Sequence, residues 1–361
     1  MKILVIGAGM IGSLIADELS KDYSVMVIDN DYKKLDNINS RNNKIQCFNL
    51  DVKNDDVTSL VKNNNLAVNC LPGFMGFEML KNILRNKVSC IDISFMPENI
   101  MDLSGLAISN DCVVIPDAGV APGLSNLIAG KLVSNNEINK IQIMVGGLPK
   151  EKNPPWNYKA PFSPIDVIEE YTRDARVRVN GNLEIKPALT EKLIFDVEGI
   201  GELEAFLTDG LRTLLDEKGT LAEVPNLSEY TIRYPGHCDL VKKMISDGKF
   251  SEQNIDSTCK ELFKIWKLEK GEEEFTFMLI VATKKDGQEI SYTVFDKYTN
   301  GWSSMSRTTG LTACAFSKLV LEKEIKETGI ICPERIGTES RFHDFIINYL
   351  KEKGISIEVY N

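Results

Sequence analysis

The sequence predicts an α/β protein with two parts, a doubly wound parallel sheet followed by a second α+β domain built on a mainly antiparallel sheet. Three observations predict it. Apolar runs alternate with helical segments over the first 120 residues, and a glycine-rich turn follows the first run. From residue 138 onward, the strand-like runs instead alternate apolar with polar side chains. A length of 361 residues suits two domains of ordinary size.

The first part contains six short runs that are apolar throughout. Such runs are typical of strands in a parallel sheet that helices cover on both faces. Between the runs, apolar residues recur at helical spacing, as Ile11, Leu14 and Leu19 do in the first segment. The predicted strands are 2–8, 24–28, 45–50, 66–70, 88–93 and 112–115, and the predicted helices are 10–20, 31–39, 57–62 and 77–86.

The turn after the first strand reads GAGMIG. Because it stands between a strand and a helix, it matches the dinucleotide fingerprint of a Rossmann domain. Gly7 permits the tight turn, Gly9 lets the backbone approach a pyrophosphate, and Gly12 allows the helix to pack closely. Met10 and Ile11 lie in the first helical turn, whose free N–H groups favour the diphosphate. The pattern therefore predicts a nicotinamide dinucleotide as cofactor.

An acidic residue, Asp29, ends the second strand. A carboxylate at this position accepts hydrogen bonds from the adenosine ribose and repels a 2′-phosphate, which favours NAD over NADP. Lys33 and Lys34 follow closely and leave NADP possible. Asp51, after the third strand, is a weaker candidate for the adenine edge. The structural alternative for Asp29 is that its side chain caps the next helix.

Three later strand ends carry further candidates. Cys70, Leu71 and Pro72 end the fourth strand, where the chain passes the nicotinamide half of the cofactor. Asp92 ends the fifth strand, and Asp117 begins a loop rich in glycine and proline after the sixth. Open α/β sheets place their ligands at these carboxyl ends. The alternative for the Cys70 segment is a plain turn, and for each carboxylate it is the capping of its own loop.

The second part is predicted to form a sheet with one solvated face, because its strand-like runs alternate apolar and polar residues. Residues 285–288 have the composition of a hairpin turn. The predicted strands are 138–147, 176–179, 192–197, 203–207, 230–234, 274–283 and 289–297, with helices at 164–172, 209–216 and 239–246. Helices at 308–325 and 342–350 then return the chain to the first domain. We predict domains at 1–124 (dinucleotide binding), 125–305 (substrate and oligomerisation) and 306–361 (the returning helices).

Charge and composition exclude several classes of function. The chain has 42 Lys and Arg against 52 Asp and Glu, a net charge of −10, which argues against general binding of nucleic acids or anionic membranes. No apolar run approaches the length of a membrane span. The eight cysteines form no CxxC pair and only two histidines occur, so no metal site is predicted. Free thiols and the lack of a signal cleavage site indicate a cytoplasmic protein.

Several motifs together resemble a known family. VIGAGMIG, DAGVAPGLSN, VGGLP, FSPIDV, TDGLRTLL, TIRYPGH and SSMSRTTG occur in this order. Together they are similar to the saccharopine dehydrogenase (glutamate-forming) superfamily, and most of all to its short lysine 6-dehydrogenase branch. The resemblance implies NAD-dependent oxidative deamination of the ε-amino group of L-lysine. The product would be 2-aminoadipate 6-semialdehyde, which cyclises to a piperideine carboxylate.

Two other functions stay open. The first is an imine reductase on the same fold, either a saccharopine reductase or a carboxynorspermidine-type enzyme, which uses NADP. The second is a non-catalytic homologue that binds NAD without turnover. Apart from a small amino acid as substrate, the expected partner is a second copy of the chain. A homo-oligomer, a dimer or larger, would cover the edges of the second sheet.

Oxidation of an amine requires particular groups. The amine must lose a proton before hydride leaves, so a general base is needed, and a negative group would stabilise the iminium ion. Asp92, Asp117 and His237 are the candidates for these roles. The alternative for His237, which stands where a strand breaks into a turn, is a hydrogen-bonded turn histidine.

The substrate carboxylate calls for an arginine, whose planar fork matches it. Arg233 is the main candidate, and Tyr171 and Arg307 are weaker candidates for substrate contact. Their structural alternatives are an exposed strand arginine, a packing tyrosine and an interdomain ion pair, respectively.

Overall fold

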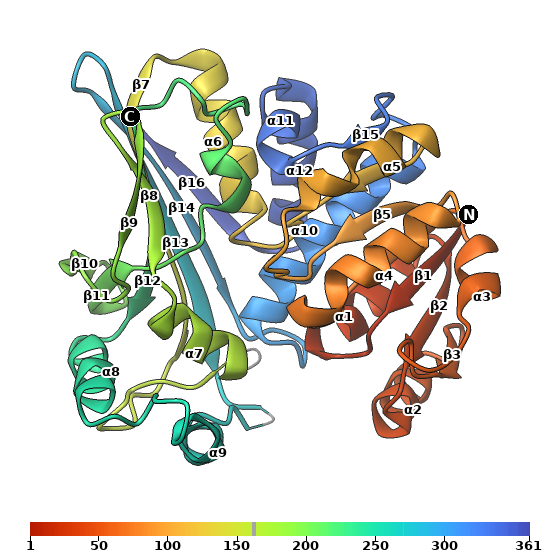
Figure 1. Ribbon diagram of the computed structural model, residues 1–361, viewed down its shortest axis with the longest axis horizontal. Coiled ribbons are helices and arrows are strands. Elements are labelled where there is room, and N and C mark those ends of the chain that lie inside the picture. The colour runs from red at the N-terminus through yellow and green to blue at the C-terminus, as the bar shows by residue number, and fades with distance from the viewer. Residues whose placement is uncertain (161–163, 270) are drawn as a thin grey trace. The chain divides into compact units, whose positions relative to one another are not determined.

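The computed structural model describes residues 1–160, 164–269 and 271–361, and leaves the side chains of residues 164–166 undescribed. The FSPIDV motif therefore begins outside the described residues. The chain divides into two compact units (Figure 1). The first comprises Met1–Lys131 and Ser306–Glu352, and the second comprises Leu132–Met305 and Lys353–Asn361.

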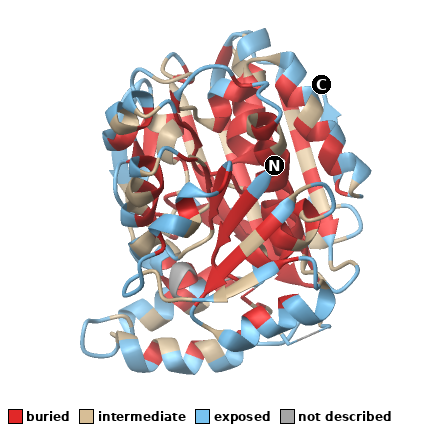
Figure 2. Cartoon of the chain, turned by 90° about the vertical axis from the view of Figure 1, so that its right-hand side faces the viewer, coloured by how far each residue is buried: buried red, intermediate tan, exposed pale blue. Residues whose placement is uncertain are grey.

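A parallel sheet, seven-stranded over the residues described, forms the centre of the first unit. Its order is β15-β6-β5-β4-β1-β2-β3, so the chain winds outward in opposite directions from β1 and from β4. Figure 2 shows strands buried along most of their length; the exception in this sheet is the edge strand β3, whose residues are exposed or half-buried. Their bounds are β1 Lys2–Ile6, β2 Ser24–Asp29, β3 Gln46–Asn49, β4 Leu66–Asn69, β5 Ser89–Asp92, β6 Val113–Ile115 and β15 Gly329–Ile330.

Helices cover both faces of this sheet. Helices α1 (Met10–Leu19) and α2 (Tyr32–Arg41) connect β1, β2 and β3 toward one edge of the sheet, whereas α4 (Gly73–Arg85) and α5 (Ser104–Ser109) connect β4, β5 and β6 toward the other. Because such crossovers are right-handed, the two pairs of helices lie on opposite faces. Within the unit, α10 packs so closely on α1 that a Cβ at Gly310 would strike Leu14. The other helices are α3 Thr58–Lys62, η1 Ile100–Leu103, α6 Leu124–Asn135, α10 Ser304–Leu321, α11 Pro333–Gly337 and α12 Ser340–Glu352.

The second unit is built on a mixed sheet that has nine strands over the described residues, seven of them in one continuous order and two beside it. Paired strands run antiparallel, except that β12 and β7 are parallel. The order is β10-β11-β12-β7-β13-β14-β16, and β8 pairs with β12 and β9. The bounds are β7 Ile138–Pro149, β8 Ala175–Val179, β9 Asn182–Lys186, β10 Leu193–Val197, β11 Gly201–Leu207, β12 Asn226–Arg233, β13 Glu274–Lys284, β14 Glu289–Lys297 and β16 Ser356–Tyr360.

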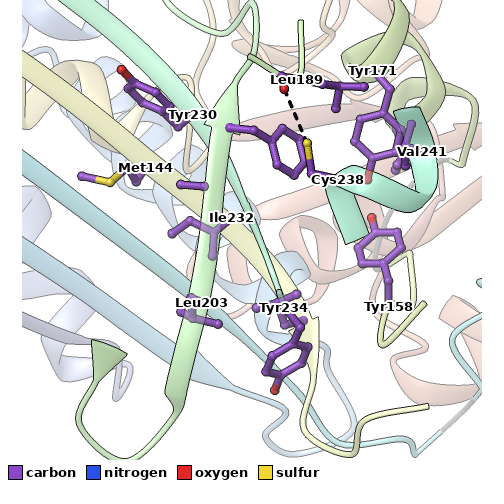
Figure 3. Packing of buried hydrophobic residues seen from close by; sticks show 14 of the residues in the cluster. Met144, Tyr158, Tyr171, Leu189, Leu203, Tyr230, Ile232, Tyr234, Cys238 and Val241 are labelled. Carbon is purple, nitrogen blue, oxygen red and sulfur yellow. Dashed lines mark hydrogen bonds between the residues drawn. The ribbon is translucent and has the colours of Figure 1, made fainter. Parts of the chain in front are cut away.

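Helices α7 (Pro164–Thr172), α8 (His237–Ser246) and α9 (Ile255–Ile265) pack on one face of this second sheet. The core beneath them is rich in aromatic side chains, among them Phe206 and Trp266, which are 0% exposed. Figure 3 shows part of this core. The aromatic packing positions the candidate residues of the second unit.

Two predicted helices need correction. The one expected at 209–216 is only a 3-10 turn, η2 (Arg212–Leu215). Asp209 is not part of this turn, because the carboxylate of Asp209 accepts two hydrogen bonds from the guanidinium of Arg176. The helix expected from residue 308 begins earlier, at Ser304. The main-chain N–H and the hydroxyl of Ser304 both donate to the buried carboxylate of Glu274, which fixes the start of the helix there.

The end of the chain also differs from the prediction. Residues 306–361 were expected to be returning helices, yet Ser356–Tyr360 forms β16 and pairs with β14 of the second sheet. These five residues form a strand because their backbone pairs with the open edge of β14. The run is too short for its apolar and polar residues to predict a strand. The short elements β9, β15, α5 and α11 were not predicted, nor was α9 (Ile255–Ile265), an 11-residue helix in which apolar and polar residues are mixed.

The described part of the chain contains no helix long and apolar enough to cross a membrane. Within it, the eight cysteines are free thiols, and no group of His, Cys, Asp and Glu side chains is placed to hold a metal ion.

Candidate active site

The glycine turn between β1 and α1 has the shape of an anion cradle. Gly7 has a φ of +105°, a conformation that favours glycine. A Cβ at Gly12 would overlap the carbonyl oxygen of Gly7, so the helix can come this close only without a side chain. Gly9, the helix N-cap, faces open space, and no described side chain caps this helix end. The first turn, with Met10 and Ile11, therefore leaves an uncapped helix N-terminus for an anion.

The carboxylate of Asp29 ties this turn to β2. Its Oδ2 accepts a hydrogen bond from the N–H of Ala8 at 2.7 Å, and its Oδ1 accepts one from the N–H of Asp31 at 2.8 Å. Nζ of Lys34 lies 3.7 Å from Oδ1. Asp31 is the N-cap of α2, accepting from the N–H of Lys33, so Asp29 is not the helix cap. Asp29 is therefore buried at the position where the fingerprint expects it.

The remaining cofactor candidates lie in loops at the same edge of the sheet. Asp51 accepts hydrogen bonds from within its own turn, at 3.0 and 2.8 Å, so its carboxylate shapes the loop after β3. Cys70, Leu71 and Pro72 connect β4 to α4, with Pro72 as the N-cap. A Cβ at Gly7 would strike the carbonyl of Cys70, which shows that this loop lies directly against the glycine turn.

Asp92 forms a buried polar network with Asn69 and Ser94 at the ends of β4 and β5. Its Oδ2 accepts from Nδ2 of Asn69 at 2.7 Å, and its Oδ1 accepts from the N–H and the hydroxyl of Ser94 at 2.8 and 2.6 Å. Burial raises the pKa of Asp92 to about 7, and the nearby charge of Asp117 adds to the increase. Asp92 is 0% exposed, and its role as general base or iminium stabiliser stays a prediction.

Asp117 lies close to this network, at the start of the loop after β6. Its φ is +51° and its side chain is buried. The next residue, Ala118, donates its N–H to the main-chain oxygen of Asp92 at 2.9 Å. The structure therefore brings the two predicted carboxylates together at the carboxyl edge of the parallel sheet. The sequence analysis missed Asn69 and Ser94, although an asparagine ending an apolar strand is an available signal.

In the second unit, the structure brings Arg233, Tyr171 and His237 together. Arg233 is 2% exposed, and its Nε donates to the hydroxyl of Tyr171 at 2.9 Å. Its guanidinium carbon lies 4.3 Å from the centre of the Tyr158 ring, and Nη2 lies 3.4 Å from a carboxylate oxygen of Glu170. Figure 3 shows the hydroxyls of Tyr158 and Tyr171 pointing toward one another. Arg233 is thus a buried cation between aromatic rings, not an exposed strand arginine.

Tyr171 connects Arg233 to His237. The Tyr171 oxygen lies 2.9 Å from Nε2 of His237, and Nδ1 lies 3.2 Å from the main-chain oxygen of Trp156. A carbonyl can only accept, so Nδ1 carries the hydrogen and Nε2 accepts from Tyr171. Burial lowers the pKa of His237 to about 3, and the charge of Arg233 lowers it further. With both nitrogens engaged, His237 is placed to position Tyr171, and its role as the general base stays a prediction.

Another buried carboxyl, Glu229, lies earlier in β12 and was not predicted as a site residue. Glu229 accepts from the hydroxyl of Thr208 at 2.8 Å, and that hydroxyl lies 2.9 Å from the hydroxyl of Thr231. Burial raises the pKa of Glu229 to about 8, and the charges of Glu170 and Asp209 add to the increase. Its signal is the alternation of Glu229, Thr231 and Arg233 with Tyr230 and Ile232 at the end of this strand.

Arg307 lies in the first turns of α10 and is 8% exposed. It belongs to the first unit, whereas Arg233 and Tyr171 belong to the second. Its predicted role in substrate contact stays a prediction.

The parallel sheet, its order and the glycine cradle define a dinucleotide-binding domain of the Rossmann class. The chain belongs to the saccharopine dehydrogenase family. The family model described as the saccharopine dehydrogenase NADP binding domain matches residues 3–115, and the saccharopine dehydrogenase C-terminal domain matches residues 119–355. These matches confirm the resemblance predicted from the motifs.

Individual relatives agree with this assignment. The chain is 20% identical over 446 residues to the mitochondrial alpha-aminoadipic semialdehyde synthase of Rattus norvegicus, covering 98% of this chain and 47% of that protein. It is 22% identical over 452 residues to the NADP(+), L-glutamate-forming saccharopine dehydrogenase of Schizosaccharomyces pombe, covering 99% of this chain and 98% of that enzyme. The chain spans about half or less of the synthases that it matches.

A solved structure shows the same fold. The apo saccharopine dehydrogenase (L-Glu forming) from Saccharomyces cerevisiae aligns with a TM-score of 0.82 at 18% identity, over 100% of both chains. This confirms the predicted fold class. The fungal relatives that are named saccharopine dehydrogenase are described as NADP(+)-linked and L-glutamate-forming.

Proposed function

We propose that the protein interconverts saccharopine with L-glutamate and 2-aminoadipate 6-semialdehyde, with NADP as its dinucleotide. In the oxidative direction, one water is consumed and the dinucleotide takes up a hydride, with release of a proton. The observation that carries this proposal is the similarity to an L-glutamate-forming, NADP-linked enzyme over nearly the full length of both chains.

The residues of the first unit fit such a cofactor. A bound dinucleotide would supply the hydride acceptor or donor of the reaction. The uncapped start of α1 would hold the diphosphate, since Gly9 leaves room for close approach. Asp29 would meet the adenosine ribose. Lys34, whose Nζ is 3.7 Å from this carboxylate, offsets its charge and would make a 2′-phosphate acceptable.

In the second unit, Arg233 is our candidate for a substrate carboxylate. Its guanidinium donates to the hydroxyl of Tyr171 and lies over the ring of Tyr158. The side chain of its partner Glu170 is 29% exposed. We propose that a substrate carboxylate takes the place of the Glu170 carboxylate beside Arg233. This exchange keeps the buried cation paired, which a buried charge requires.

For proton transfer and charge stabilisation at the imine, we propose Asp117. Asp92 is committed to Asn69 and Ser94, and His237 is neutral with both nitrogens engaged. Asp117 begins its loop at the carboxyl edge of the parallel sheet, where ligands of this fold bind. A carboxylate there would stabilise the developing iminium charge.

NAD-dependent deamination of L-lysine is the second candidate, and Asp29 is the observation that favours it. A buried carboxylate at the end of β2 is the residue expected for NAD and opposes a 2′-phosphate. The two candidates therefore differ both in cofactor and in substrate.

A single set of assays tests both. Reduction of NAD and of NADP is followed by absorbance at alkaline pH with saccharopine, L-lysine and simple diamines. Reduction of NADP with saccharopine supports the proposal. Reduction of NAD with L-lysine alone would replace it with the second candidate. If the protein binds the dinucleotides and reduces neither with any substrate, both candidates fail and the non-catalytic reading gains support.

We also propose that the protein forms a homo-oligomer through the second sheet. The outer strands β9 and β10 carry exposed apolar side chains, which is unusual for an edge left in water. These side chains are Leu183, Ile185, Leu193 and Ile194. A cytoplasmic location remains a prediction of the sequence.

A further inference from the structure

The carboxyl ends of β4, β5 and β6 share one anchor, which is Asp92. Its side chain accepts from Asn69, the last residue of β4, and from Ser94 in the loop after β5. Its main-chain oxygen accepts from Ala118, in the loop after β6. Because Asp92 and Asn69 are both 0% exposed, these bonds are not weakened by competition with water.

The same network holds the start of α4. Nδ2 of Asn69 also donates to the main-chain oxygen of Gly76 at 3.2 Å. A Cβ at Gly76 would overlap the hydroxyl oxygen of Ser94, and a Cβ at Gly73 would overlap the carbonyl oxygen of Phe95. The first two turns of α4 thus lie directly on the loop after β5. A movement of the loop after β5 or of the loop after β6 would therefore require the other loop, and α4, to move as well.

We propose that Asn69, Asp92 and Ser94 form a positioning network for the nicotinamide half of the cofactor site. The network acts through the loops after β4, β5 and β6 and touches neither cofactor nor substrate. The inference deepens the proposed function, resting on it only in taking a dinucleotide to bind at this edge.

The order of the sheet shows which half of the cofactor is concerned. The dinucleotide crosses the sheet where the winding direction changes, between β1 and β4. The adenosine half lies toward β2, where Asp29 stands, so the nicotinamide half lies toward β4 and β5. The network is therefore on the nicotinamide side, and the glycine turn and Asp29 are not part of it.

Asp92→Asn is the informative variant, because it preserves shape and removes an acceptor. If its amide oxygen stays with Ser94, its NH₂ group faces the NH₂ group of Asn69, and two donors oppose each other. If the Asn69 amide flips to relieve this, its oxygen faces the carbonyl of Gly76. The first case loses the hydrogen bond between Asn69 and residue 92, and the second loses the bond from Asn69 to Gly76 that holds α4.

The experiment separates the two halves of the cofactor. Binding of reduced dinucleotide is measured by its fluorescence, and binding of ADP-ribose, or of its 2′-phosphate for an NADP-preferring protein, is measured by calorimetry. For Asp92→Asn we expect the Kd of the reduced dinucleotide to rise about tenfold, as for one lost buried hydrogen bond. The Kd of the fragment, which lacks nicotinamide, should change less than about twofold. Ser94→Ala should show the same split with a smaller effect, since its N–H bond to Asp92 remains.

The control is Asp17→Asn, the same chemical change in α1, away from the carboxyl edge, where the carboxylate pairs with Arg41. Both Kd values should be unchanged in it. Equal weakening of dinucleotide and fragment in Asp92→Asn and Ser94→Ala would mean a general loss of fold and would overturn the inference, as would no change in either. The readout needs no substrate. A protein that binds cofactor but does not oxidise saccharopine would disprove the proposed function and leave this inference to its own test.

Discussion

The hydroxyl of Tyr171 lies 2.9 Å from Nε2 of His237 and accepts a hydrogen bond from Arg233, so its own hydrogen is directed to the imidazole. This relationship sets the protonation of His237. The imidazole is a neutral ring that receives one hydrogen bond from Tyr171 and gives one to Trp156. It links the one buried cation of this cluster to the main chain and cannot take up a proton without breaking the link.

The first prediction concerns the state of His237. We expect its ring to be neutral from pH 5 to 9 with the hydrogen on Nδ1, because burial and the charge of Arg233 lower its pKa to about 3. Nitrogen-15 NMR of histidine-labelled protein reports both tautomer and titration. The chain has only two histidines, so His343→Gln assigns the spectrum. A titration midpoint near 6.5, the ordinary value, would contradict the structure.

The second prediction concerns stability. Tyr171→Phe removes one hydroxyl but leaves two buried groups without a partner, Nε of Arg233 and Nε2 of His237. We expect a loss of about 2–4 kcal/mol in the free energy of unfolding. Tyr234→Phe is the matched control, because its hydroxyl serves only the Pro149 carbonyl at 3.0 Å and should cost about 1 kcal/mol. Urea unfolding of both variants measures the difference, and equal losses would count against the linked arrangement.

The third prediction concerns the pH dependence of stability. Burial raises the pKa of Asp92 to about 7 in the folded protein, against its ordinary value of 3.8. Between these values the folded state holds a proton that the unfolded state has released, so this group makes stability fall as pH rises. Relative to Asp92→Asn, the unaltered protein should lose about 2–3 kcal/mol between pH 5 and 8. Urea unfolding at several pH values gives the comparison.

Glu229→Gln tests the same reasoning in the second unit. Burial raises the pKa of Glu229 to about 8, so its contribution also falls with rising pH, and the fall continues to about pH 8. If the free energy of unfolding of the unaltered protein instead rose with pH, relative to either variant, the fold would be stabilising the charged carboxylate, and the prediction would be wrong.

The fourth prediction concerns the choice of cofactor. Asp29→Ser should weaken binding of NAD and raise the preference for NADP, because the carboxylate that opposes a 2′-phosphate is gone. Lys34→Gln should weaken NADP and leave NAD nearly unchanged, since Nζ lies 3.7 Å from that carboxylate. The ratio of the two Kd values is the quantity to measure, because Asp29 also binds Ala8 and its loss affects both cofactors. An unchanged ratio in both variants would remove these residues from the selectivity.

Some of the site follows from local pattern alone. The turn from Gly7 to Gly12 is predicted because a fixed spacing of glycines between a strand and a helix has one structural solution. Asp29, Asp92 and Asp117 are placed at one edge because the carboxyl ends of parallel strands lie together. These predictions need only the period of the apolar residues and the direction of the chain.

Other features could not be predicted from the sequence. Tyr171 is 62 residues from Arg233 and 66 from His237, and their hydrogen bonds arise only once α7 and α8 pack on the second sheet. Burial of these groups changes their chemistry, from exposed cation and base to a paired cation and a neutral ring.

The sequence by itself determined the parallel sheet, the glycine cradle for a dinucleotide and the family, since each depends on residues near one another in the chain or on motifs in a set order. Only the tertiary structure decided that Asp92 is fully buried against Asn69 and Ser94, that His237 is held neutral, and that β16 is added to the edge of the second sheet beside β14. The physical reason is that burial and strand pairing are set by distant segments meeting, and they in turn set the charge and the hydrogen-bond partners of each side chain.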